Sequence, residues 1–289
     1  MTHKTVASVE HAPPAHWVGD GFHVRPLFAG KAFTPAVSPF LMLDYAAPVN
    51  FPPRPGNPPG VGPHPHRGFE TVTIVYQGEI EHRDSAGHSG KIGAGDVQWM
   101  TAARGVVHDE FHSKEQSAKG GLVSMVQLWV NLPAKDKMSN PRYQTLLAAD
   151  IPTVALGEDG TLRVIAGEFA GHKGPAMTFS PVSVWDVRLN VGGATEIPFA
   201  RGHRSMIPVL DGEVRIGGRS FKAGDVVFLS EDGDAVALEA TREAKLLVLT
   251  GEPINEPIAH YGPFVMNTQA ELRQAVEDFR AGRMGDLAA

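Results

Sequence analysis

Residues 64–79 read HPHRGFETVTIVYQGE, and this stretch decides the fold of the chain. Its later part, 71–76, is rich in β-branched and aromatic residues and is followed by Gln77-Gly78-Glu79, so it predicts a strand that ends in a turn. Its first part carries His64 and His66, two positions apart. Because alternate side chains of a strand point to the same face, both imidazoles face one way if this part is also extended.

A second pair with the same spacing, His108 and Glu110, follows after glycine turns at 94–96 and 104–105. If the two extended segments lie side by side, three imidazoles and one carboxylate converge on a single point. Neutral imidazole and carboxylate suit first-row divalent ions, and four such ligands leave positions on an octahedral ion for water or substrate. The spacing therefore predicts one divalent metal ion bound by four residues, which are His64, His66, His108 and Glu110.

An isolated His-x-His pair is more often a surface or turn feature than a metal site, and the chain contains 13 histidines. The second pair is what favours the metal interpretation. Glu70 adds an alternative, because its side chain would point to the same face as those of His64 and His66 if that strand runs unbroken. It would then be a distal ligand or a partner that orients an imidazole by a hydrogen bond, and we favour the second role.

Four segments of the chain resemble the motifs of the pirin family, a branch of the cupin superfamily. They are HPHRGFETV at 64–72, GDVQWMTA at 95–102, GEP at 251–253 and YGPFVMNT at 261–268. The resemblance runs from the region of Val24 to the C-terminal end of the chain. It implies an all-β bicupin fold, in which two antiparallel β-barrel (jelly-roll) domains are followed by a C-terminal α-helix.

The resemblance also implies a ligand set and a cofactor. Most cupins take a glutamate ligand from the first motif, whereas pirins resemble this chain in drawing it from the second motif, two residues after the histidine. The implied ligands are therefore His64, His66, His108 and Glu110, and the role of Glu70 stays open. The implied ion is non-haem Fe(II), while copper, nickel, cobalt, manganese and zinc also suit such ligands.

The activity that the resemblance implies is a dioxygenase reaction, the opening of a flavonol such as quercetin, or of a similar enediol, with molecular oxygen. Glu110 would be its catalytic residue by accepting the hydroxyl proton of the substrate. An alternative is a metal-responsive regulatory binding protein that acts on a partner protein without turnover, as some family members do. A storage or structural metal protein is a third interpretation. We place the enzyme first, because open coordination positions are what chemistry needs.

An internal repeat predicts that the two halves of the chain share one architecture. AGDVQWM at 94–100 is echoed by AGDVVFL at 223–229, and QGEI at 77–80 is echoed by DGEV at 211–214. Counted from these turns, the positions that match the three histidines are Pro198, Ala200 and Ala237. Only Glu110 keeps a carboxylate, at Glu239, so we expect no metal ion in the second half. The nearby His203 is interpreted as a structural or surface residue.

We expect an N-terminal metal-binding cupin domain over 1–145 and a degenerate cupin domain without metal ligands over 146–289. The second domain should end in a helix, because Thr268–Glu271 forms a capping-box pattern. Four apolar residues follow at helical spacing, namely Leu272, Ala275, Val276 and Phe279. This apolar stripe is expected to pack against the barrels.

Composition excludes several classes of protein. A net charge of −6 argues against direct nucleic-acid binding, which needs a basic face to displace phosphate counterions. The absence of cysteine excludes disulfides, thiolate ligands and redox cysteines. Residues 1–15 lack the apolar core of a signal peptide, and no apolar run approaches the ~18 residues that span a bilayer. We therefore expect a cytoplasmic protein without membrane contact.

Several residues close to the motifs have simpler structural interpretations. His82, His88 and His112 are explained by positions on the surface of a strand or loop. Trp99 is expected to fill the interior of the barrel rather than to bind substrate. For the charge of Arg67, we expect an ion pair into the barrel wall.

Overall fold

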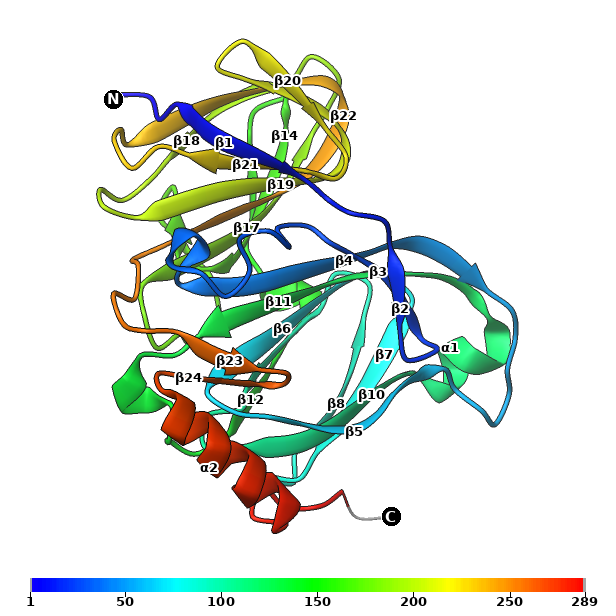
Figure 1. The fold of residues 1–289 in the computed structure, drawn as a ribbon. Coiled ribbons are helices and arrows are strands. Elements are labelled where there is room, and N and C mark those ends of the chain that lie inside the picture. Colours follow the sequence, from blue (N-terminus) through cyan, green and yellow to red (C-terminus); the bar gives the residue numbers. More distant parts are fainter. Residues whose placement is uncertain (1, 288–289) are drawn as a thin grey trace.

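The computed structural model describes residues 2–287, which form two β-rich halves stacked on each other (Figure 1). The first half contains a seven-stranded and a four-stranded antiparallel sheet, which pack together through residues such as Val75 and Ile80. The larger sheet runs in the order β12 (Arg142–Leu146), β9 (Val97–Thr101), β6 (Phe69–Gln77), β11 (Gly121–Asn131), β4 (Phe40–Phe51), β3 (Phe22–Pro26) and β2 (His16–Val18). The smaller sheet runs in the order β5 (Gly60–His66), β10 (Val106–His112), β7 (Glu79–Asp84) and β8 (Ser89–Gly93).

The second half is built on a nine-stranded sheet. Its main path is β1 (Val6–His11), β21 (Asp225–Leu229), β19 (Arg204–Ile216), β22 (Ala235–Gly251), β17 (Val182–Leu189), β14 (Gly160–Ala166) and β13 (Thr153–Ala155). Beside this path, β18 (Ala194–Pro198) pairs with β22, and β20 (Arg219–Lys222) pairs with β19. Two small hairpins are β15 (Glu168–Phe169) with β16 (His172–Lys173), and β23 (Ala259–Tyr261) with β24 (Phe264–Met266). The helices are α1 (Lys114–Lys119) and α2 (Gln269–Arg280), with 3-10 turns at Pro35–Val37, Ala134–Asp136 and Ala148–Asp150.

The prediction of a mainly antiparallel β fold in two halves is confirmed, but that of closed barrels is wrong. The strands of each half form open sheets, because the pairing paths end at unpaired edge strands. In the first half the chain passes from one sheet to the other at Gly68, between β5 and β6. Its φ of 88° is a left-handed conformation that glycine adopts without strain, and a Cβ there would overlap the carbonyl oxygen of Val265.

One apolar core joins the two halves. It includes Trp99 and Val126 from the seven-stranded sheet together with Ile165 and Leu247 from the nine-stranded sheet. The expectation that Trp99 fills the interior of the barrel is wrong, because its fully buried side chain lies in this core between the halves, on the face of β9 opposite to Gln98. Because the same cluster lies under sheets of both halves, the halves cannot separate without exposing it to water.

The two ends of the chain each pack on the half that is distant in sequence. Strand β1 pairs with β21 of the second half, while the β23–β24 hairpin and α2 cover the smaller sheet of the first half (Figure 1). Arg67 contributes to this contact through an ion pair between its Nη1 and Asp278 Oδ2 at 2.6 Å, so its partner is helix α2 and not the barrel wall. The division of the chain near residue 145 stays a prediction, and its outer limits, residues 1 and 288–289, lie outside the described residues.

Helix α2 begins as the sequence predicts. Thr268 Oγ1 accepts a hydrogen bond from the backbone N–H of Glu271 at 3.2 Å, and Glu271 Oε2 accepts one from the backbone N–H of Thr268 at 2.8 Å. Leu272 and Ala275 are buried in the contact with the first half. In the described part of the chain, no helix has both the length and the apolar character needed to cross a membrane.

A buried lysine joins three segments next to the Gly68 turn. Lys137 Nζ donates hydrogen bonds to the carbonyl oxygens of Gly68 at 2.6 Å and Val265 at 3.0 Å, and to Asn131 Oδ1 at 2.6 Å. These three acceptors match the three N–H donors of an ammonium group. Burial lowers the pKa of Lys137 to about 7, so the group is held by hydrogen bonds at a cost in desolvation.

Replacing this lysine should destabilise the fold. In Lys137→Met the three acceptors lose their donor while they remain buried, so we expect the free energy of unfolding to fall by about 2 kcal/mol or more. Chemical denaturation followed by circular dichroism measures this change. Lys135→Met, at an exposed position of the same segment, is the matched control. Equal stabilities of the two variants would contradict the bridging role.

Candidate metal centre

Strands β5 and β10 bring three of the predicted ligands together. The two strands are antiparallel, with His64 directly opposite His108. The ring centroids lie 4.3 Å apart for His64 and His108, 4.8 Å for His66 and His108, and 4.8 Å for His64 and His66. One ligand atom from each ring lies within 4.8 Å of the others, which is the spacing of donors around one ion. We call these residues the three-histidine group.

The hydrogen bonds of the group leave its nitrogen lone pairs free for an ion. His64 Nδ1 lies 2.9 Å from the carbonyl oxygen of Gly62, and His66 Nδ1 lies 3.4 Å from that of Pro263. A carbonyl oxygen accepts only, so each Nδ1 carries the proton and each Nε2 carries a lone pair. His108 Nε2 is buried and makes no hydrogen bond, as expected for a nitrogen that binds a metal ion.

The electrostatic surroundings keep two of these rings, those of His66 and His108, uncharged. Burial, and then the neighbouring imidazoles, lower the pKa of His66 and of His108 well below the ordinary value. Only a neutral imidazole can bind a divalent ion, so the pKa shifts favour this function. His64 is partly exposed and follows the exposed residues Gly62 and Pro63, which leaves the group reachable from solvent.

Glu110 lies beside His108 but does not complete the three-histidine group. It belongs to a second group with His82 and His108, whose ligand atoms also lie within 4.8 Å of one another. An irregularity of pairing between His108 and Glu110 sets the carboxylate opposite Val61 on β5. Two amide donors hold the carboxylate, Gln98 Nε2 at 3.1 Å from Oε1 and Gln127 Nε2 at 3.2 Å from Oε2. The hydroxyl of Thr73 donates its one hydrogen to Gln127 Oε1 at 2.6 Å.

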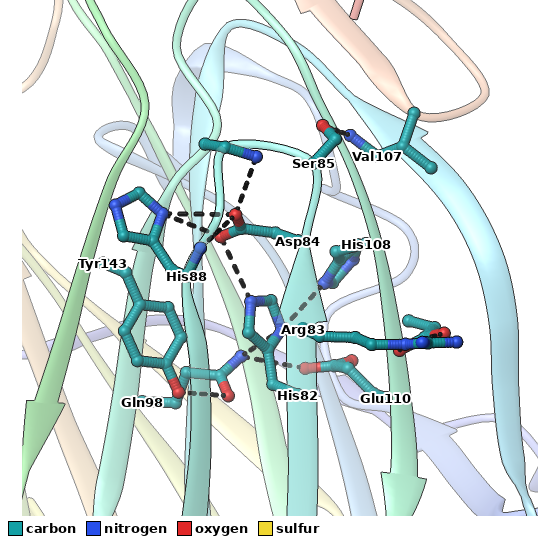
Figure 2. A network of polar contacts seen from close by, with 12 residues as sticks. His82, Arg83, Asp84, Ser85, His88, Gln98, Val107, His108, Glu110 and Tyr143 are labelled. Carbon is teal, nitrogen blue, oxygen red and sulfur yellow. Dashed lines mark hydrogen bonds and ion pairs between the residues drawn. The ribbon is translucent and has the colours of Figure 1, made fainter. Parts of the chain in front are cut away.

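The surface interpretation of His82 and His112 is wrong. Both side chains are almost fully buried, because the residues at 80, 82 and 84 of β7 and at 108, 110 and 112 of β10 point into the first half. His82 lies behind His108, with their Nδ1 atoms 3.2 Å apart (Figure 2). His112 Nε2 is bonded to the carbonyl oxygen of Gly21 at 2.9 Å. His88 is half-buried and contacts Asp84.

Glu70 lies apart from both groups. The turn at Gly68 breaks the strand after His66. Glu70 therefore does not point to the same face as the histidines, as it would on one unbroken strand. Glu70 Oε1 instead accepts a hydrogen bond from Thr101 Oγ1 at 2.7 Å in the larger sheet, and Arg142 Nη2 lies 3.9 Å away. Burial raises the pKa of Glu70 to about 7.

The second half presents different residues at the matching positions. Ala237 and Glu239 point to the outside of β22, where Glu239 pairs with Arg215 at 3.2 Å. Pro198 and Ala200 line a cavity of about 330 Å³ together with the half-buried His203. Both groups of metal-ligating residues found among residues 2–287 lie in the first half.

A larger cavity lies next to the smaller sheet. It has a volume of about 740 Å³, and its lining includes Arg83, Lys91 and Asp109, which point away from the three-histidine group. Residues 56–58 of the proline-rich loop form part of its wall. His82 also borders this cavity, whereas none of the three residues of the three-histidine group does.

Comparison with protein-family models decides the classification. The model described as "Pirin" matches residues 21–130, and the model described as "Pirin C-terminal cupin domain" matches residues 184–285. The chain belongs to the pirin family. The fold is accordingly that of two cupin domains, and the resemblance deduced from the four sequence motifs is confirmed.

Three known proteins are similar to this pirin in sequence or in structure. A Pseudomonas aeruginosa protein named "Putative quercetin 2,3-dioxygenase" is 55% identical over 281 residues, covering 97% of this chain and 98% of its own. The crystal structure of a quercetin 2,3-dioxygenase from Acinetobacter baumannii matches with a TM-score of 0.96 and 50% identity, over 99% of this chain and 100% of that one. A more distant bacterial pirin from Escherichia coli, solved with nickel(II), shares the fold at a TM-score of 0.63 and 19% identity, over 85% and 100% of the two chains.

The buried Glu70 of this pirin predicts a pH dependence of stability. Its pKa is about 7 in the folded protein against an ordinary value of 4.5, so between these values the folded state binds more protons than the unfolded state. The free energy of unfolding should therefore fall as the pH rises from 4.5 to about 7. Glu70→Gln should flatten this decline and leave the metal content per chain unchanged.

Denaturation series across this pH window, with elemental analysis of the same samples, measure both effects. Glu158→Gln, at an exposed position, is the control for a change of net charge. An unchanged pH profile in Glu70→Gln would contradict the buried protonated carboxyl. Complete loss of metal from that variant would make Glu70 a ligand.

Proposed function

We propose that this pirin is a metal-dependent dioxygenase that opens flavonols such as quercetin with molecular oxygen. It would hold one divalent ion, Fe(II) by preference, on His64, His66, His108 and Glu110. The observation that carries the proposal is the buried, unpartnered Nε2 of His108, which lies beside the imidazoles of His64 and His66. The similarity to proteins named as quercetin 2,3-dioxygenases supports the choice of substrate.

The chemistry of the donors suits such an ion. Three uncharged nitrogens and one carboxylate give a set of intermediate softness that accepts iron as well as nickel, copper, cobalt, manganese or zinc. When bound, the ion would supply Lewis acidity and, for iron, electron exchange with oxygen. His64 lies at the solvent side of the group, so a substrate would approach past this residue. Glu110 is included because it extends from β10 two residues after His108.

Glu110 is also the proposed proton acceptor. Each carboxylate oxygen accepts one hydrogen bond from a glutamine amide, Oε1 from Gln98 at 3.1 Å and Oε2 from Gln127 at 3.2 Å. Each oxygen therefore keeps a lone pair that is available for the hydroxyl proton of a flavonol. The two glutamine amides fix the carboxylate of Glu110 in position, which favours transfer of the substrate proton to its oxygens.

A regulatory binding protein is the second candidate function, and one contact favours it. His66 is hydrogen-bonded to Pro263, which lies in the turn of the β23–β24 hairpin, and Tyr261 of this hairpin is 67% exposed. A change of metal state at His66 would reach an exposed surface by this route. Turnover of quercetin separates the candidates, because a regulator would bind the ion without consuming oxygen. The cytoplasmic location stays a prediction.

Removing His108 should remove the metal ion. After anaerobic loading with Fe(II), His108→Ala should contain almost no metal by elemental analysis, because the group loses the ring that contacts both other histidines. His203→Ala, in the second half, should retain the content of the wild type. Full metal content in His108→Ala would reject the assignment of the centre.

Replacing the proposed base should slow turnover. Glu110→Gln keeps the shape of the side chain but cannot accept a proton, so we expect kcat for oxygen uptake with quercetin to fall about 10²-fold or more. Glu239→Gln, at the matching position of the second half, is the control and should leave kcat unchanged. Oxygen electrode measurements with a panel of flavonols test this. Equal kcat values for Glu110→Gln and the wild type would overturn the role of Glu110.

A further inference from the structure

Three polar contacts meet at His82, whose ring lies between Asp84 and His108 (Figure 2). His82 Nδ1 lies 3.2 Å from His108 Nδ1 and 3.4 Å from Gln98 Nε2. On the other side of the ring, His82 Nε2 lies 3.3 Å from Asp84 Oδ2. The neighbours on the two sides determine where the protons of both imidazoles lie, as follows from the donor and acceptor character of each group.

The amide of Gln98 determines whether His82 Nδ1 carries a proton. Tyr143 donates its hydroxyl hydrogen to Gln98 Oε1 at 3.1 Å, so the amide nitrogen faces the opposite way, toward His82 and toward Glu110 Oε1 at 3.1 Å. An amide nitrogen donates hydrogen bonds and does not accept them. His82 Nδ1 must therefore accept, and it carries no proton.

The carboxylate of Asp84 determines whether His82 Nε2 carries a proton. It accepts hydrogen bonds from the backbone N–H groups of Ala86 at 2.9 Å and His88 at 3.0 Å. Burial alone would raise the pKa of Asp84, but the hydrogen bonds from His82 and from the amide of His88 bring it below its ordinary value. An ionised carboxylate only accepts, so the single proton of a neutral His82 lies on Nε2.

We propose that His82, backed by Asp84, is a positioning residue that holds His108 in the tautomer with its proton on Nδ1 and its Nε2 lone pair directed at the metal ion. Since His82 Nδ1 has no proton, the hydrogen of the 3.2 Å contact belongs to His108 Nδ1. The arrangement Asp84–His82–His108 then accounts for the unpartnered Nε2 of His108. Tyr143 stacks on His82 at a centroid distance of 4.8 Å and keeps the ring in its plane.

Two consequences follow for the metal ion. The negative charge of Asp84, transmitted through His82, increases the basicity of His108, and partners of this kind change metal affinity 10- to 100-fold. This consequence rests on the proposed function, whereas the tautomer does not. The second group consists of Glu110 and the two histidines whose Nδ1 atoms lie 3.2 Å apart. Because these atoms share one proton, we expect one ion per chain and not two.

The tautomers can be measured without metal. In metal-free protein labelled with ¹⁵N-histidine, long-range ¹H–¹⁵N correlation spectra should show His108 protonated on Nδ1 and His82 protonated on Nε2. In His82→Phe, which keeps an aromatic ring but has no acceptor, His108 should populate both tautomers. The Fe(II) dissociation constant, measured by competition with a chelator, should then rise 10- to 100-fold.

Matched variants separate positioning from a general loss of packing. His82→Gln offers an amide oxygen to His108 and should recover part of the affinity that His82→Phe loses. His88→Gln removes another partner of Asp84, at 3.1 Å, without touching His108, and should bind Fe(II) like the wild type. If His82→Phe does not fold, Asp84→Asn tests the same arrangement, and it should shift the tautomers of both histidines.

Each outcome bears on the proposal. A metal-free wild type with His108 protonated on Nε2 would overturn it, as would a dissociation constant in His82→Phe equal to that of the wild type. Two ions per chain would overturn it in favour of a second metal position. If the tautomers are as expected but no divalent ion binds the wild type, the proposed function fails while the positioning of His108 stands.

Discussion

The removal of uncharged imidazoles from water is the constraint on which the first half depends. A neutral histidine has one nitrogen that donates and one that accepts, and both need partners when the ring is buried. The donor side of each ring in the three-histidine group is met by a different part of the chain. Gly62 serves His64, Pro263 serves His66, and the buried ring of His82 lies against His108. The acceptor nitrogen of His108 has no such partner, and the proposed metal ion would satisfy it.

Much of this arrangement could be read from the sequence, because it depends on strand alternation. His64 and His66 lie on one strand, and His108 and Glu110 lie on another, so the spacing alone was enough to group the three rings. The capping box of Thr268 was an equally local feature, because it is a hydrogen-bond pattern within four residues. The face to which Trp99 points was not local, since its burial depends on how the two halves pack.

What the sequence did not reveal depends on where strands break and which strands pair. The prediction for Glu70 assumed that the alternation of side chains continues from His66 through Gly68, although the glycine turns the chain into another sheet. His82 was missed although His82-Arg83-Asp84 has the same alternating spacing as the ligand pairs. Its position became clear only from the pairing of Glu110 with His82. The partner of Glu110 across a bulge could not be found by counting residues.

The contact between His66 and Pro263 joins residues 197 positions apart, and this separation constrains the biosynthesis of the protein. A ribosome releases the strands of the three-histidine group well before the β23–β24 hairpin. During most of translation, the nascent chain therefore holds His66 without the carbonyl that orients it. A message truncated before this hairpin would yield a protein whose three histidines are all present but in which His66 lacks its Pro263 partner. Completion of the centre is thus tied to synthesis of the hairpin.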